Sequence, residues 1–406
     1  MKPASLLLPL IFTLACSAAA DQADQAGGIE RQDLYAAGRG GYAVYRIPGM
    51  IATADGTLLA YCEARRTKHD WADIDIVCRR STDGGQTWAG PQVIANVPEQ
   101  TPRNPAAIAV RQRSPKLAAG PTCNNAVMIA GDQPGLVHLL YCVEYQTCWY
   151  KRSLDDGINW SEPTEVTPAL ERLKSEFDFR VVATGPGHGL RHSSGRLIVP
   201  VWLSMGRGDN AHGTICVTSL VSDDAGATWQ SGEIVAKPPE FADPNETCAV
   251  ELSDGRVLFN SRNTDRRNRR LIAISEDGAT NWSPPRFDDQ LVEPVCQGSL
   301  LSMKDRNGTH LILFSNPRSL APVPGRPDST RRSRQNLTVR LSADDGQSWP
   351  SWRTIDPGIS GYSDLASTGD GQVFCLYENG RDGRNQFAHD SLTLARFSLS
   401  SIRTGD

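Results

Sequence analysis

A short motif, S-x-D-x-G-x-x-W, recurs along the chain and constrains the fold more than any other feature. Four copies are intact, and a degraded fifth, SEDGATNW (275–282), has its glycine displaced. We expect each copy to form a tight turn in which Asp accepts backbone N–H groups, Gly adopts positive φ and Trp packs on the neighbouring layer. Chance does not explain five copies, so the chain is predicted to be a repeat structure. The intact copies are STDGGQTW (81–88), SLDDGINW (153–160), SDDAGATW (222–229) and SADDGQSW (342–349).

Hairpin signatures alternate with these motifs. In YRIPGMIATADGTLLAYCEARR two apolar runs flank an ADG turn, which is typical of a β-hairpin. Four further segments have this form, and a looser sixth unit starts at NPAAIAV, with an insertion around 111–124. Each hairpin supplies two strands and each motif joins two more. We therefore predict an all-β fold, a six-bladed β-propeller of four-stranded antiparallel blades. The units start near 42, 104, 180, 246, 297 and 362, the last ends in LTLARFSL, which is expected to close the ring, and helical periodicity is confined to 168–175.

The N-terminus is typical of an export signal. Lys2 precedes an apolar run from Leu6 to Leu14, and small residues end at Ala20. The run is too short to span a bilayer, and no other segment is predicted to insert stably in a membrane. We predict a signal peptide at 1–20, a linker at 21–40, a propeller at 41–402 and a periplasmic or extracellular location. A lipid anchor at Cys16 is the alternative.

Charge and cysteine content narrow the function classes. A formal net charge of −4 argues against nucleic-acid partners, although a local cationic pocket for an anionic small molecule remains compatible with it. Removal of Cys16 leaves nine cysteines, an odd number, and no C-x-x-C occurs. We expect buried small hydrophobic residues with one or two disulfide bridges and no zinc cluster. No cofactor or metal is predicted, and the oligomeric state is left open.

Ionisable residues are predicted to meet at one face of the repeat. The xDG turns and the boxes lie on one face, so the starts of first strands, the ends of second strands and the starts of third strands lie on the other. Counting outward from the turn centres places three pairs there. Two further residues are expected at the same face: Asp70, in the loop after Arg65, and Arg334, at the start of the strand that leads to the motif at 342–349. The pairs are Arg46 with Arg65, Glu246 with Arg262, and Tyr362 with Glu378, accompanied by Asp70 and Arg334.

These segments resemble the bacterial-type exo-α-sialidase (neuraminidase) family with Asp-box (BNR) repeats. The similarity covers about 40–400 and includes YRIP (45–48), EARRTKHD (63–70), FNSR (259–262), GYSDL (361–365) and LYENG (376–380). The resemblance implies substrate-binding and catalytic roles for eight residues. These are Arg46, Arg262 and Arg334 as a triad for the substrate carboxylate, Arg65 beside it, Glu378 orienting the first arginine, Asp70 as acid/base, Tyr362 as nucleophile and Glu246 as its partner.

The chemistry of sialic acid accounts for these residue types. Its anomeric carbon bears a carboxylate, which arginine guanidinium groups match in charge and planarity. A carboxylate nucleophile at about 4 Å would be repelled by roughly 4 kcal/mol at an effective dielectric near 20. A neutral tyrosine avoids that repulsion if a base accepts its proton. The hypothesis is retaining hydrolysis of terminal α-linked sialic acid from glycoproteins, glycolipids or oligosaccharides through a tyrosyl-enzyme intermediate.

Three other functions compete with hydrolysis. A trans-sialidase would use the same residues, with a sugar replacing water. A non-catalytic sialic-acid-binding propeller would keep the arginines but could lose Asp70, Glu246 or Tyr362, all of which are present. A purely structural propeller would not need the arginines. The resemblance departs at Asn104, where many bacterial relatives have Asp near the groups that contact the N-acetyl group. GPGHG (185–189) with His188 is interpreted as a turn, and RRNRR (266–270) and RRSR (331–334), apart from Arg334, as exposed loops.

Overall fold

The computed structural model describes residues 28–106, 108, 112, 120–206, 212–380 and 389–404. The predicted signal peptide and Cys16 lie outside these ranges. Within them the fold is all-β, as predicted, and the helical residues are few: the 3-10 segments η1 (Thr167–Ser175) and η2 (Leu399–Ser401), and positions 105, 106, 108 and 112. The described helices include none with the length and apolarity that crossing a membrane requires.

Four sheets follow one another along the chain, each an antiparallel succession of neighbouring strands. Central strands of these sheets are buried on both faces, because each sheet packs between two others. The first sheet comprises β2 (Val44–Ala52), β3 (Leu58–Arg65), β4 (Ile74–Ser81) and β5 (Gln92–Ala95). The second comprises β6 (Cys123–Ala130), β7 (Val137–Val143), β8 (Thr147–Ser153) and β9 (Thr164–Glu165). The third comprises β10 (Val181–Thr184), β12 (Leu197–Ser204), β13 (Ile215–Ser222) and β14 (Gln230–Ser231), with β11 (Leu190–Arg191) beside β12, and the fourth comprises β15 (Thr247–Glu251), β16 (Val257–Ser261), β17 (Arg269–Ser275) and β18 (Arg286–Val292).

The fifth sheet has eight strands, because one long strand joins two groups. β22 (Ser351–Ser367) pairs with β21 (Gln335–Ser342) along its first part and with β23 (Gln372–Gly380) along its second. The remaining strands are β19 (Ser299–Lys304), β20 (His310–Pro317), β24 (Ser391–Ser398), β1 (Glu30–Ala36) and the short β25 (Arg403–Thr404). The last two predicted units are therefore hydrogen-bonded into one sheet.

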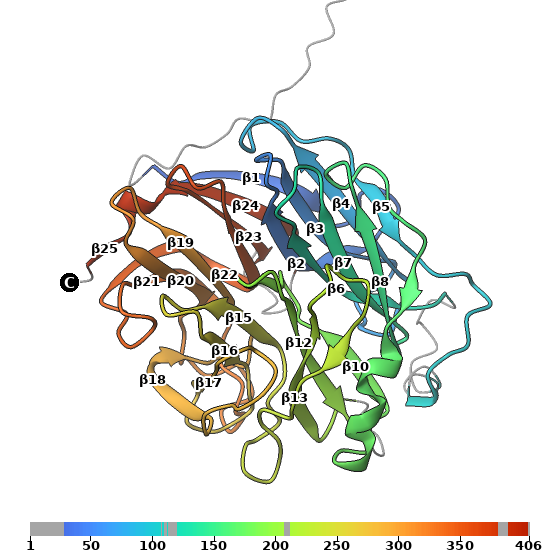
Figure 1. Cartoon of the computed structure of the whole chain (residues 1–406). Coiled ribbons are helices and arrows are strands. Elements are labelled where there is room, and N and C mark those ends of the chain that lie inside the picture. Colours follow the sequence, from blue (N-terminus) through green and yellow to red (C-terminus); the bar gives the residue numbers. More distant parts are fainter. Residues whose placement is uncertain are drawn as a thin grey trace, which may run out of the picture.

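The sheets are arranged around a common centre (Figure 1). Contacts run in a closed circle, from β2 to β6, β6 to β10, β12 to β15, β15 to β19, β19 to β22 and β22 back to β2. Apolar clusters fill the spaces between successive sheets. One of them joins Leu140 of β7 and Val199 of β12 to Leu170 of η1. The starts of the first strands therefore converge at one end of the molecule.

The N-terminal strand corrects the predicted domain boundary. Residues 30–36 fall in the predicted linker, yet they form β1, which pairs with β24. Leu34 and Tyr35 of β1 are buried in an apolar cluster with Tyr45 of β2 and Leu58 of β3. The closing strand of the last sheet thus comes from the opposite end of the chain. Only three consecutive apolar residues mark it, which is too short a pattern to identify a strand from sequence.

The repeated motifs form the predicted turns at the end of the sheets remote from the convergence point. In the second motif, Asp155 accepts the Asn159 N–H at 2.8 Å, and the hydroxyl of Ser153 accepts the Gly157 N–H at 2.8 Å. Gly157 has φ of 78°, and the Trp160 indole donates to the Gly157 carbonyl at 3.2 Å. Trp160 also packs against an apolar cluster that includes side chains of the first sheet. These contacts confirm the expected Asp, Gly and Trp roles.

Two hairpin pairs agree with the predicted register and one does not. Arg262 donates its N–H to the Glu246 carbonyl at 2.9 Å, as counted. Tyr362 lies in the interruption of the β22–β23 ladder, and the adjacent pair of Ser363 with Tyr377 has the counted register that places Tyr362 beside Glu378. Arg46, however, is opposite Glu63. The count is already wrong by one residue next to the turn, and a bulge between Arg46 and Gly49 shifts the ladder by one more.

The second unit also starts later than predicted. Its first strand is β6 (Cys123–Ala130), not the NPAAIAV segment. Asn104 is instead buried beside the unit, where its side-chain amide donates to the carbonyls of Tyr145 at 3.4 Å and Arg180 at 3.1 Å. The first strand of this unit follows the insertion, so the prediction that the unit starts at NPAAIAV is wrong.

The cysteines from Cys62 to Cys375 are nine in number, and all are buried free thiols in the structure. The prediction that they act as small hydrophobic residues is confirmed, whereas the expected one or two bridges are not formed among them.

Candidate active site

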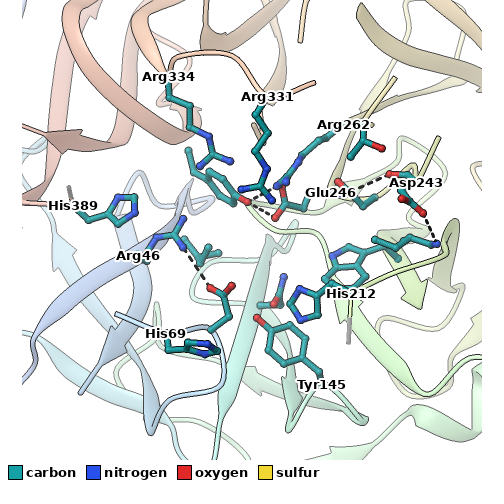
Figure 2. A pocket seen from close by; sticks show the side chains of 18 of the residues that line it. Arg46, His69, Tyr145, His212, Asp243, Glu246, Arg262, Arg331, Arg334 and His389 are labelled. Atoms are coloured by element: carbon teal, nitrogen blue, oxygen red, sulfur yellow. Dashed lines mark hydrogen bonds and ion pairs between the residues drawn. The ribbon is translucent and has the colours of Figure 1, made fainter. Parts of the chain in front are cut away.

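A cavity of about 520 Å³ opens where the sheets converge, and polar side chains from every sheet line it (Figure 2). These side chains project from the starts of first strands, the ends of second strands and the starts of third strands, which is the predicted face. Seven of the eight predicted site residues line the cavity, and Glu378 lies directly behind it. The seven are Arg46, Arg65, Asp70, Glu246, Arg262, Arg334 and Tyr362.

Tyr362 is at the centre of the site, with its hydroxyl between a carboxylate and a guanidinium. The hydroxyl donates to Oε1 of Glu246 at 2.5 Å and accepts from Nη1 of Arg262 at 2.6 Å. Arg262 also donates to Oε2 of Glu246, which closes a three-membered network. Burial raises the pKa of Tyr362, and Glu246 adds to the rise although Arg262 opposes it. The phenol is therefore protonated at rest and needs a base to react.

A carboxylate beneath the cavity orients two parts of the site. Glu378 accepts from Nε of Arg46 at 3.0 Å and from the backbone N–H groups of Ile47 at 3.2 Å and Tyr362 at 3.1 Å. Burial opposes its ionisation, but Arg46 and smaller contributions from neighbouring groups together outweigh that effect, and the pKa of Glu378 falls to about 2. One fixed charge thus positions the first arginine and the backbone of the tyrosine.

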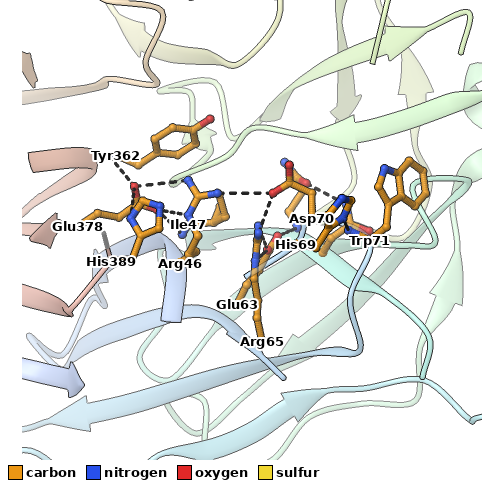
Figure 3. A network of polar contacts seen from close by, with 12 residues as sticks. Arg46, Ile47, Glu63, Arg65, His69, Asp70, Trp71, Tyr362, Glu378 and His389 are labelled. Carbon is orange, nitrogen blue, oxygen red and sulfur yellow. Dashed lines mark hydrogen bonds and ion pairs between the residues drawn. The ribbon is translucent and has the colours of Figure 1, made fainter. Parts of the chain in front are cut away.

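Asp70 is held at the rim by two arginines (Figure 3). Its Oδ1 accepts from Nη1 of Arg65 at 2.6 Å and faces Nη1 of Arg46 at 3.5 Å, while 45% of its side chain is exposed. The fully buried Arg65 is fixed from behind by Glu63, whose Oε2 accepts from its Nε at 2.8 Å. Enclosure opposes ionisation, yet Arg65 and Arg46 hold the pKa of Asp70 well below its usual range. The carboxylate of Asp70 is therefore ionised at neutral pH.

Arg334 completes the predicted set from directly before β21. Its Nη2 donates to the Val295 carbonyl at 2.7 Å. The guanidinium carbons of Arg46, Arg334 and Arg262 lie 5.3, 5.2 and 6.0 Å from the centre of the Tyr362 ring. Three permanent positive charges thus surround one phenol on the cavity floor.

Comparison with known proteins places this geometry in a family. The model of the BNR repeat-like domain matches residues 56–375. A sialidase of Micromonospora viridifaciens is 34% identical over 86% of this chain and 52% of its own length. The chain belongs to the sialidase family with BNR repeats. A sialidase of Bacteroides fragilis is 28% identical over 84% of this chain and 61% of its own.

Solved structures agree on the fold of this sialidase-family chain. The "Hadza microbial sialidase Hz136" superposes with a TM-score of 0.71 at 24% identity, covering 92% of this chain and 69% of the solved one. That similarity supports the all-β architecture alone. The chain spans about half the length of the Micromonospora relative and about three fifths of the Bacteroides one.

The structure of this sialidase-family chain adds a cation that sequence reasoning assigned to an exposed loop. Arg331, in RRSR, lines the cavity and points toward Glu246 (Figure 2). Enclosure and the like charges of Arg262 and Arg334 lower its pKa. Its position three residues before Arg334, next to the start of a third strand, was the available signal.

Aromatic side chains form one wall of the cavity, and the sequence analysis did not identify them. Tyr145 and Trp202 line the cavity with ring centres 6.1 Å apart, and Trp71 packs behind Tyr145 at 4.7 Å. Tyr145 is in the turn between β7 and β8, and Trp202 is near the end of β12, so they come from two sheets. Asn125 lines the cavity nearby, whereas Asn104 is absent from the described lining. No spacing pattern links these residues, since each belongs to a different hairpin.

The described residues contain no group of three or more His, Cys, Asp or Glu arranged to hold a metal ion. His188 is a structural residue in the turn before β11, where its Nδ1 is 2.8 Å from Oδ1 of the buried Asp364. The site therefore offers arginines for an anion, a central phenol at Tyr362, and the carboxylates of Glu246 and Asp70 in different environments.

Proposed function

We propose that the chain is a retaining exo-α-sialidase that hydrolyses terminal α-linked sialic acid from glycoconjugates. The contact of the Tyr362 hydroxyl with Glu246 at 2.5 Å, within a ring of arginines, is the observation that supports this most strongly. A phenol held by a base beside permanent positive charges suits a substrate that bears a carboxylate at its reacting carbon. Family membership and the named sialidase relatives agree with it.

In this proposal Arg46, Arg262 and Arg334 bind the substrate carboxylate. Each charge-assisted contact is worth about 1.5–3 kcal/mol. Arg46 is already oriented by Glu378, and Arg334 by the Val295 carbonyl, so both guanidinium groups are ordered before the substrate arrives. The bound carboxylate places the anomeric carbon above the phenol.

Tyr362 acts as nucleophile and Glu246 as its base. As the phenol oxygen attacks the anomeric carbon, its proton passes to Oε1 of Glu246 and the glycosidic bond breaks. Arg262, which donates to both oxygens, stabilises negative charge on either side of that transfer. Water then attacks the same carbon, the phenol oxygen leaves and recovers its proton from Glu246, and the configuration is retained.

Asp70 protonates the leaving glycosidic oxygen and later accepts a proton from the attacking water. Its carboxylate is ionised because Arg65 and Arg46 face it. A negatively charged substrate bound to Arg46 offsets part of that positive field and raises the pKa of Asp70, so substrate binding itself prepares the acid. The exposed side chain faces the opening, where the leaving group departs.

Architecture and location complete the proposal. We infer six blades, with the two parts of β22 belonging to successive blades and β1 completing the last one. The closed circle of contacts among inner strands and the change of pairing partner within β22 support this count.

Export to the periplasm or outside the cell, by way of residues 1–20, would bring the enzyme to sialylated glycoproteins, glycolipids or oligosaccharides.

Replacing Tyr362 by Phe tests the mechanism. Turnover of a fluorogenic methylumbelliferyl sialoside should fall at least about 1,000-fold, because the nucleophile is lost while folding is kept. Tyr377→Phe is the matched control, because Tyr377 is a buried tyrosine that bonds Asp356 at 2.7 Å outside the cavity. Its kcat should stay within about threefold of the native value.

Three outcomes would decide between the competing functions. Unchanged turnover in Tyr362→Phe removes Tyr362 as nucleophile. A well-folded native protein that binds sialic acid saturably without turnover is a lectin instead. Product analysis with lactose as acceptor separates hydrolysis from transfer, since a trans-sialidase would yield sialyllactose in preference to free sialic acid.

A further inference from the structure

Two thiols face each other behind the cavity wall. Cys142 of β7 and Cys148 of β8 are direct partners across the antiparallel ladder. Both are fully buried in one apolar cluster, and both are free in the structure. The three residues between Val143 and Thr147 form the turn that carries Tyr145 into the cavity.

The backbone contacts of Cys148 show which kind of ladder pair this is. Its N–H donates to the Thr167 hydroxyl at 2.9 Å, and its carbonyl accepts from the Val166 N–H at 2.8 Å. Both groups therefore point away from β7. In an antiparallel sheet such residues form a non-hydrogen-bonded pair, with Cα atoms about 4.5 Å apart and side chains close together. This separation is at the short end of the range of about 4.4–6.8 Å that disulfides occupy.

As direct cross-strand partners, the two side chains point to the same face of the sheet and into the same apolar cluster. Thr184 flanks the pair, with its hydroxyl 3.8 Å from the sulfur of Cys142. The nearest cysteine on the next strand, Cys123, is opposite Val143 and belongs to a different apolar cluster. Side chains alternate along a strand, so Cys123 faces the other side of the sheet.

We propose that Cys142 and Cys148 form a cross-strand disulfide when the chain folds in an oxidising compartment. The two thiols lose two protons and two electrons to a small-molecule disulfide such as oxidised glutathione. Its S–S bond breaks to give two thiols as the protein S–S bond forms. Because both side chains are fully buried in the folded state, exchange occurs before β7 and β8 finish packing. The structure corresponds to the reduced form.

The bridge would stabilise a strained turn beside the candidate active site. Glu144 and Tyr145, at the tip, have φ of 56° and 50°, a region that residues other than glycine rarely occupy. A covalent link at the base of the turn restricts the unfolded chain and holds both strands in register. The proposal is independent of the catalytic roles, because sulfur chemistry can be measured without a substrate.

Peptide mapping of the full chain tests the bridge. The protein is purified after export to a bacterial periplasm, denatured in iodoacetamide and digested with trypsin without reductant. Cleavage after Lys116 and Lys151 releases one peptide that holds Cys123, Cys142 and Cys148. We expect one alkylated cysteine and a mass lower by two hydrogens than that of the dithiol form. Reduction before alkylation should give three alkylated cysteines.

Single substitutions assign the partners. Cys123→Ser should keep the bridge, and Cys148→Ser should abolish it. Three alkylated cysteines without reductant, or a bridge that survives in Cys148→Ser, would overturn the proposal. If a serine variant folds poorly, thermal unfolding of the native chain provides the second readout. A reductant should lower its midpoint by several degrees, and an unchanged midpoint would contradict the bridge.

Discussion

At the scale of single residues, the candidate site depends on a carboxylate that never reaches the cavity. Glu378 accepts from the Arg46 side chain and from the backbone of Ile47 and Tyr362. Arg46 and Ile47 are more than 300 residues from Glu378 in the chain, and Tyr362 is on the neighbouring strand. The side chain is almost completely buried, so its charge interacts with them through little intervening water.

Glu378→Gln should change how stability depends on pH. The pKa of Glu378 is about 2 in the folded chain, below the value of about 4.3 expected when it is unfolded. A lowered pKa contributes stability above the unfolded value and loses it as the pH falls through the folded one. The difference in unfolding free energy between native and variant proteins should be constant above about pH 5, roughly 3 kcal/mol, and should shrink toward about pH 2.

Chemical denaturation at several pH values measures this difference. The exposed Glu240→Gln is the control and should lie within about 0.5 kcal/mol of the native chain throughout. A difference between native and Glu378→Gln proteins that stays constant down to about pH 2 would argue against the charged Arg46–Glu378 pair.

At the scale of elements, bulges and close approaches aim the side chains. β22 changes partner along its length, and its ladder with β23 is interrupted between Ser360 and Ser363. Gly361 lies in that interruption, directly above Glu378. A Cβ there would be 2.2 Å from Oε2 of Glu378. The absence of a side chain at this position lets the carboxylate reach the backbone N–H of Tyr362.

Gly361→Ala should therefore reduce both stability and turnover. Overpacking typically costs about 1–3 kcal/mol, and displacement of Glu378 would misplace Arg46 and Tyr362. Gly90→Ala is the matched control, because its Cβ would meet no atom within 4 Å. Denaturant unfolding and steady-state kinetics measure the two effects. Native stability and kinetics in Gly361→Ala would show that Glu378 moves without cost.

The turns at the opposite end should matter for stability alone. The buried hydroxyl of Ser342 accepts the Gly346 N–H at 2.9 Å and donates to Asp344 at 2.7 Å. Ser342→Ala leaves a buried N–H unsatisfied and should lower the free energy of unfolding by about 1–3 kcal/mol, with kcat and KM unchanged. The exposed Ser193→Ala should alter neither. A large kinetic change in Ser342→Ala would place the turns in the functional machinery.

At the scale of the whole molecule, the two ends of the chain close the structure. β1 pairs with β24, and the Thr393 hydroxyl of β24 donates to Asp33 of β1 at 2.6 Å. Leu34 packs into the cluster that joins this sheet to the first one. The arrangement explains why inner strands from distant segments stay in contact around one centre.

Leu34→Ala should show how much this closure contributes. Truncating a buried leucine costs about 2–5 kcal/mol, and here the loss falls on the junction between the last sheet and the first. Leu154→Ala is the matched control, because that leucine is 69% exposed, and it should stay within about 0.5 kcal/mol of native. Equal stability of the two variants in denaturant unfolding would mean that β1 is dispensable for closure.

Local chemistry determined much of this protein from sequence alone. Turn motifs and alternating apolar residues act over fewer than about ten residues, so they predicted the all-β class, the turns and the face where the site forms. Seven of the eight predicted residues line the cavity, and Glu378 supports it from behind. The Glu246–Arg262 register followed from a regular hairpin.

Tertiary structure alone decided the features that depend on distant partners. The bulge after Arg46, the continuity of β22 and the pairing of β1 have no local signature. Each is set by packing between segments that are far apart in the chain, where one inserted residue changes the direction of a side chain. Short-range patterns specify which strands form, whereas the contacts among sheets decide which side chains meet.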